Sequence, residues 1–159
     1  MSVLSWAVWG FGATVVLTTI LAGSQGMGLT RLSLPSLLGA FFTPDRDRAR
    51  AVGIAVHLVN GWVLSLAYFG VFAATGRPSV ALGAAVGLVH GLFVAAVGLQ
   101  ALPAVHPRIA RPHAGPTSER RIEPPGFLGR NYGWSTAAVV LLAHAVFGAV
   151  LGFGASFAR

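Results

Sequence analysis

The chain has 159 residues, of which 55% are hydrophobic and only 9% are charged. A soluble domain carries about 25% charged residues, so this composition excludes an ordinary soluble protein and predicts that lipid is the main solvent. The net charge of +7 does not indicate nucleic-acid binding, because the basic residues cluster in loops between apolar segments. The absence of Cys excludes disulfides, thiolate metal ligands and Cys nucleophiles.

Four apolar segments are long enough to cross a bilayer, which takes about 20 residues of helix. They predict helices over residues 2–22, 44–75, 79–102 and 133–157. Helices are favoured over strands, because open strands leave backbone groups without partners in lipid. We therefore predict an all-α integral membrane protein, a single domain (1–159) folded as a four-helix transmembrane bundle.

The first segment, residues 2–22, lacks the basic start and the cleavage motif of a secretory signal peptide, so we expect a retained helix. Gly10, Thr14, Thr18 and Ala22 recur every four residues and share one face. Small residues let membrane helices approach closely, so this face is predicted to pack against another helix.

The first loop contains an apolar run, residues 35–42, that is too short to span and predicts a short interfacial helix. The next residues are typical of a helix start, with Thr43 as N-cap and Pro44 in the first helical position. Asp45 and Asp47 carry favourable charge for that helix start. They are either solvated there or dock a partner subunit.

Gly76, Arg77 and Pro78 form a tight turn, so the second and third helices are predicted to be an antiparallel hairpin. Glycines recur every four residues on the third and fourth helices, a pattern typical of close helix contact. The glycines concerned are Gly83, Gly87 and Gly91 on the third helix and Gly148 and Gly152 on the fourth.

A long loop, residues 103–132, holds six of the nine prolines. Loops of this length are functional or disordered in most small proteins. Its second half mixes Pro, Gly and aromatic residues, as an ordered turn at an interface does. We take Phe127 and Tyr132 as candidate docking residues for a partner subunit.

Nine of the eleven Arg residues lie in the first and third loops. By the positive-inside rule these loops are cytoplasmic and both termini lie outside. The strings TPDRDRAR, GLVHGLF, PPGFLGRNYG and AHAVFGAVLG resemble a bacterial family of small four-helix integral membrane proteins with no assigned function. The resemblance implies a four-helix protein of the bacterial cytoplasmic membrane and carries over no catalytic or binding residues.

Three histidines lie inside separate apolar segments: His57, His90 and His144. Ionisable groups are costly in a bilayer and commonly mark functional sites. At about 1.5 Å per residue, their depths differ by only about 10 Å, so they are predicted to converge in one buried layer. Asn60 and Tyr68 share the helix face of His57 and join the candidate site.

Four interpretations of the histidine layer remain open at this stage. The imidazoles can form hydrogen bonds between helices, bind haem b, bind another transition metal, or line a proton or ligand path. Candidate hydrogen-bond partners are Thr14, Thr18, Asn60 and Tyr68.

The first functional hypothesis is therefore a small membrane protein whose histidine layer binds haem or a metal ion. The second is a non-catalytic accessory subunit of a larger membrane complex, or a homo-oligomer, whose polar faces serve packing. A small transporter or channel is disfavoured, because no charged residue lies deep within a span. No catalytic motif is present, so enzyme activity has no support.

Overall fold

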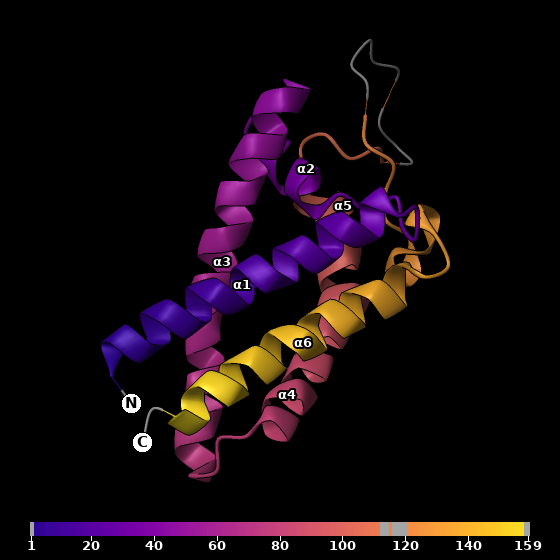
Figure 1. Ribbon diagram of the computed structural model, residues 1–159. Coiled ribbons are helices and arrows are strands. Elements are labelled where there is room, and N and C mark those ends of the chain that lie inside the picture. The colour runs from indigo at the N-terminus through magenta and orange to yellow at the C-terminus, as the bar shows by residue number, and fades with distance from the viewer. Residues whose placement is uncertain (1, 112–114, 116–120, 158–159) are drawn as a thin grey trace.

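The computed structural model describes residues 2–111, 115 and 121–157 and shows an all-helical fold in that part of the chain (Figure 1). The four predicted spans are confirmed as helices long and apolar enough to cross a membrane. They are α1 (Val3–Gly26), α3 (Arg46–Thr75), α4 with its continuation (Val80–Val105) and α6 (Thr136–Phe157). The short helix α2 (Leu34–Gly39) lies in the first loop, near the predicted run.

The start of α3 differs from the prediction. Its N-cap is Asp45, whose carboxylate accepts a hydrogen bond of 2.8 Å from the backbone N–H of Arg48. The prediction of Thr43 as N-cap and Pro44 as the first helical residue was wrong by two residues. Asp is as good an N-cap as Thr, and the sequence contains both candidates side by side.

The third span is not a uniform helix. The α-helix α4 (Val80–Phe93) passes into one π-helical turn, η1 (Val94–Gly98), and then into α5 (Leu99–Val105), which contains Pro103. The helix therefore ends three residues beyond the predicted 102. Hydropathy does not distinguish a π turn from an α turn, so the π turn could not be predicted from the sequence.

Part of the predicted loop 103–132 is ordered by polar contacts. An isolated parallel bridge joins Ile109 to Ile122, and a 3₁₀ segment, η2 (Phe127–Tyr132), leads into α6. Residues 112–114 and 116–120 of that loop lie outside the described residues. The span predicted from residue 133 begins as α-helix only at Thr136.

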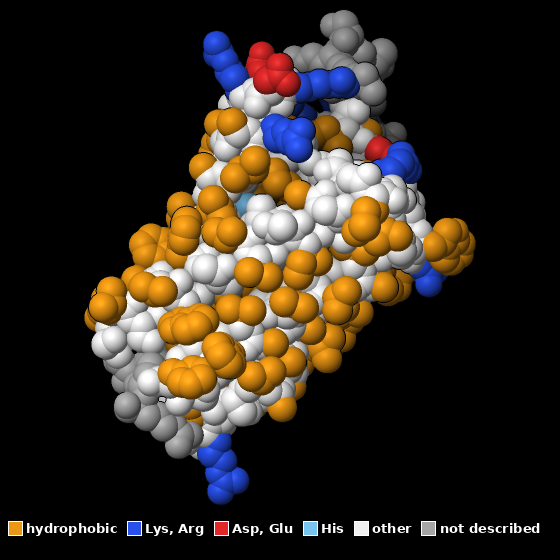
Figure 2. All heavy atoms as spheres, viewed as in Figure 1, with side chains coloured by type: hydrophobic (Ala, Val, Ile, Leu, Met, Phe, Trp, Pro, Cys, Tyr) orange, Lys and Arg blue, Asp and Glu red, His pale blue; other side chains and the backbone are white. Residues whose placement is uncertain are grey.

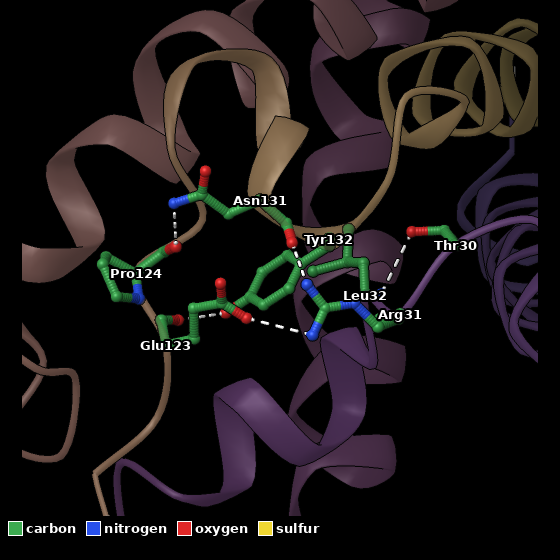
Figure 3. Close-up of polar contacts among 7 residues, drawn as sticks. All are labelled: Thr30, Arg31, Leu32, Glu123, Pro124, Asn131 and Tyr132. Atoms are coloured by element: carbon green, nitrogen blue, oxygen red, sulfur yellow. Dashed lines mark hydrogen bonds and ion pairs between the residues drawn. The ribbon is translucent and has the colours of Figure 1, made fainter.

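Arg31, just after α1, holds this loop in place (Figure 3). Its guanidinium donates to the backbone carbonyl of Asn131 and forms an ion pair of 3.1 Å with Glu123. The Tyr132 hydroxyl donates to the carbonyl of Glu123 at 2.5 Å. We call the end of the bundle that carries α2, α5 and η2 the Arg-rich end. The α3–α4 turn, the N-terminal end of α1 and the C-terminal end of α6 lie at the opposite end (Figure 1).

Helices α4 and α6 pack backbone to backbone, as the glycine pattern predicts. A Cβ placed on Gly83 would lie 2.0 Å from the carbonyl oxygen of Gly148, and a Cβ on Gly148 would lie 2.0 Å from that of Gly83. A Cβ on Gly87 would lie 2.1 Å from the carbonyl oxygen of His144. No residue larger than glycine fits this interface without moving backbone.

Helix α1 packs against α3 through the predicted small and polar face. Thr14 is fully buried and fits against Gly61, and Gly10 faces the side chain of Ser65. The Ser65 hydroxyl also accepts a hydrogen bond of 2.9 Å from the Trp6 indole. These contacts place α1 between α3 and α6, which touch each other only slightly.

The hairpin arms α3 and α4 are neighbours in sequence but pack little against each other. From their shared turn they diverge toward the Arg-rich end (Figure 1). Helix α2 packs tightly on α3 through Gly39 and Gly53, each of which lies against backbone of the other helix. The bundle is therefore closed on the α1 and α6 sides and open between α3 and α4.

Candidate functional site

A cavity of about 210 Å³ lies where the hairpin arms diverge. Its polar lining consists of His57, Asn60, His90 and His144, and the rest of its wall is leucine, valine, phenylalanine and glycine. Leu34 and Leu38 of α2 and Leu102 of α5 cover it from the Arg-rich end. All three histidines that the sequence predicts to converge therefore line one cavity.

The imidazoles of His90 and His144 are in direct contact. Their ring centroids lie 4.7 Å apart with the planes at 78°, an edge-to-face arrangement. Close packing of α4 on α6 through Gly87 and Gly91 brings them together, since the Cβ of His144 lies 3.0 Å from a Cβ placed on Gly91. The glycines beside these histidines thus make room for a neighbouring helix.

His57 is held by the Thr18 hydroxyl on α1. Its Nδ1 lies 3.0 Å from the Thr18 hydroxyl, which itself donates to the carbonyl of Thr14 at 2.7 Å. A hydroxyl has a single proton, and here that proton is used on the Thr14 carbonyl. His57 Nδ1–H must therefore donate to Thr18, which leaves Nε2 of the neutral ring as an acceptor.

His144 has the same tautomer for a different reason. Its Nδ1 lies 2.8 Å from the carbonyl oxygen of Val140, one turn earlier in α6. A carbonyl oxygen can only accept, so Nδ1 carries the proton and Nε2 is again an acceptor.

His90 connects the two hairpin arms through Tyr68. Its Nδ1 lies 2.9 Å from the Tyr68 hydroxyl, which has no other partner among the described residues. A phenol is the stronger donor of this pair and an imidazole nitrogen the stronger acceptor, so Tyr68 donates to His90. His90 then carries its ring proton on Nε2.

The second nitrogen of each ring, Nε2, has no hydrogen-bond partner among the described residues. None of these atoms is fully enclosed either, since the indole nitrogen of Trp62 is the one buried polar side-chain atom left without a partner in that part of the chain. The three lining histidines therefore have two acceptor nitrogens without a partner in that part of the chain, on His57 and His144, and one such donor, on His90. None of the cavity's lining residues in the described part of the chain is charged.

His90 and His144 cannot be the two axial ligands of one haem b. A haem with two axial histidines needs the macrocycle between the rings, and the His90 and His144 rings are already in contact at 4.7 Å. The cavity of about 210 Å³ is also smaller than the roughly 300–1,000 Å³ that hold a drug-sized ligand.

A three-histidine metal centre does not fit either. Among the described residues, no group of three or more His, Cys, Asp or Glu side chains is placed to hold a metal ion. Nδ1–H groups bound to oxygen do occur in metal-ligating histidines. In this protein the contacts of Nδ1 fix the tautomers of the rings. The sequence could not predict that the three rings are not arranged around one metal position.

The other predicted site residues are distributed as follows. Tyr68 is buried and bonded to His90, whereas Asn60 is exposed at the mouth of the cavity. Of the candidate docking residues, Asp45 caps α3, Asp47 is exposed in its first turn and Phe127 is 59% exposed.

Tyr132, the last candidate docking residue, does not present its side chain to a partner. It is buried, and its hydroxyl is bonded to the Glu123 carbonyl. Burial raises the pKa of its hydroxyl to about 12, and the Glu123 carboxylate adds to the rise while Arg31 opposes it.

A third buried histidine, His106, was not a predicted site residue. Its Nε2–H donates to the carbonyl of Leu37 at 3.0 Å, and its Nδ1 accepts from the backbone N–H of Arg108 at 3.1 Å. Both nitrogens are used, so His106 fastens the end of α5 to α2 and offers nothing to a ligand. Its position next to a helix end gave no signal of this role.

Comparison with known proteins identifies no matching family model, no matching curated protein and no matching solved structure. The family resemblance noted from the sequence therefore stays a prediction.

Proposed function

We propose that this protein is a multi-pass membrane protein that binds a small, neutral, lipid-soluble molecule in the histidine-lined cavity. The Arg-rich end faces the cytoplasm and both termini face outward, in accordance with the distribution of Arg. The chain has no Cys, so single-Cys variants at Ser2 and Ser36 can be labelled from either side of sealed vesicles. Labelling of Ser36→Cys from the outside would contradict the orientation.

The observation that carries the binding function is the free Nε2 of all three rings. Each Nδ1 is held by the protein, through Thr18, Tyr68 or the Val140 carbonyl. A purely structural histidine needs no second polar contact, but three unsatisfied nitrogens in one apolar cavity cost desolvation free energy unless a ligand or water meets them. The three rings can therefore form hydrogen bonds to one bound ligand.

The route into the cavity is lateral, from the lipid. Asn60 and Leu64 at its mouth are exposed on α3, while α2 and α5 cover the Arg-rich end. A lipid-soluble molecule therefore enters between α3 and α4. The volume fits one ring or head group, with any tail remaining in the lipid.

The tautomers specify the chemistry of the guest. The Nε2 atoms of His57 and His144 accept, so the guest must supply hydroxyl or N–H donors, and the His90 Nε2–H favours an acceptor beside them. A dihydroxy ring, such as the head group of a quinol, has this pattern. The uncharged lining excludes a charged guest, which would lose its hydration without compensation.

The test compares trimethylhydroquinone with trimethylquinone, two rings of nearly equal size that differ in donor capacity. Binding to the purified protein in detergent is measured by calorimetry under anaerobic conditions. We expect the hydroquinone to bind at least tenfold more tightly than the quinone, since an acceptor that loses its donor on ligand binding costs about 1–3 kcal/mol.

The variant His57→Leu should lose most of that preference. Thr19→Val is the matched control, because it removes a polar group from the exposed face beside Thr18 and leaves the cavity intact. Equal affinity for both rings, or a preference that His57→Leu retains, would contradict the proposal. A Soret band or one equivalent of transition metal in the purified protein would also contradict it.

A further inference from the structure

A second cavity, of about 480 Å³, lies at the Arg-rich end. Three separate segments form it: α2 with its C-cap, the start of α3, and the two ordered parts of the long loop. Arg46, Arg108 and Arg121 line it, one from α3 and two from the loop. Figure 2 shows Arg side chains gathered at this end, beyond a belt of exposed apolar side chains.

The charge of this cavity is strongly positive. Among the described residues that line it, Glu123 is the one acidic residue, and it is already paired with Arg31 at 3.1 Å. Among the described residues, the guanidinium groups of Arg46 and Arg121 have no ion pair and no hydrogen-bond acceptor. Arg forks suit phosphate oxygens in geometry as well as in charge.

Arg108 forms part of the cavity wall, and hydrogen bonds hold its guanidinium in place. Its Nη1 donates to the carbonyls of Ala40 and Phe41, the latter at 3.3 Å. These carbonyls are at the C-terminal end of α2, so Arg108 is held by that helix end. Arg46 and Arg121 then supply the two free guanidinium groups of the cavity.

We infer that this cavity binds a phosphate group with net negative charge, supplied by an anionic phospholipid of the adjoining leaflet. The observation that favours a lipid over a soluble phosphate is the pair Phe41 and Phe42, which follow the cavity residue Ala40. They are 43% and 64% exposed. Apolar side chains beside a basic pocket place the acyl chains and the head group of one lipid together.

The experiment measures the lipid retained by the full-length protein in detergent by native mass spectrometry. Dioctanoylphosphatidylglycerol, dioctanoylphosphatidylcholine and inorganic phosphate are added in separate arms. We expect at least fivefold more bound phosphatidylglycerol than phosphatidylcholine, with the difference reduced at high salt. Retention of inorganic phosphate without phosphatidylglycerol would overturn the lipid source, and equal retention of both lipids would overturn the anionic site.

The double variant Arg46→Gln/Arg121→Gln should lose the preference for phosphatidylglycerol. Arg48→Gln is the matched control, because Arg48 is two residues from Arg46 in the same exposed turn but does not line the cavity. Equal losses in the double variant and in Arg48→Gln would show diffuse attraction to the basic surface and overturn the site. Helix content measured by circular dichroism separates loss of binding from loss of fold.

Discussion

The two interfaces of α4 differ in a way that defines the functional geometry of this protein. Toward α6, α4 presents Gly83 and Gly87, and the backbones meet with no room for a methyl group. Toward α3, its covalent neighbour, it makes almost no helix contact and leaves a cavity lined by His57 and His90. Although a short turn joins α3 to α4, α4 packs on α6 and not on α3.

Side-chain size at the interface decides this difference. Without a strong hydrophobic drive in lipid, helices associate where small residues allow close van der Waals packing. On the α3 side, the residues at the mouth of the cavity, Asn60 and Leu64, are exposed, and a hydrogen bond from Tyr68 to His90 joins the two arms. Helix α4 therefore packs closely on α6 on one side. On the other side it is joined to α3 by the Tyr68–His90 hydrogen bond, and the cavity lies between these two helices.

The largest expected effect comes from breaking the tight contact. Gly83→Leu places side-chain atoms where the Gly148 carbonyl lies, so backbone must move, and we expect a loss of about 3 kcal/mol of stability. Thermal unfolding in detergent, followed by circular dichroism, measures it. Gly70→Leu on α3 is the control, because no atom lies within 4 Å of its added Cβ; similar losses in both variants would refute the argument.

A smaller effect is expected from cutting the bridge across the opening. Tyr68→Phe removes the hydrogen bond to His90 and should cost about 1 kcal/mol, a usual value for a polar contact between membrane helices. Equilibrium unfolding in mixed detergent micelles measures it. In a His90→Leu background the same substitution should cost much less, and an undiminished cost there would show that the bridge contributes nothing.

The smallest effect concerns the cavity wall. Gly98, at the end of the π turn, lines the cavity, and a Cβ there meets no atom within 4 Å. Gly98→Ala should therefore change stability by less than about 1 kcal/mol, whereas Gly87→Ala in the tight interface should cost more. The same unfolding assay compares the two, and a larger cost at Gly98 would mean that the open side of α4 is as closely packed as the other.

Much of the site was accessible to sequence reasoning. Helical periodicity placed His57 on a face with Tyr68, and rise per residue put the three histidines in one layer, which matches the shared cavity. Two of the four candidate partners, Thr18 and Tyr68, do bond to histidines, whereas Thr14 bonds to the Gly10 carbonyl. The partner of His144 is a backbone carbonyl, which no side-chain pattern reports.

The sequence by itself determined the four apolar helices, the glycine contact face and the gathering of Arg at one end. These follow from hydropathy, spacing and charge, which are local properties. Only the tertiary structure decided that α3 and α4 separate, that the long third span contains a π turn, and that each histidine keeps Nε2 free. Those features depend on which backbone surfaces fit together across the bundle, and that fit is a property of pairs of segments far apart in the chain.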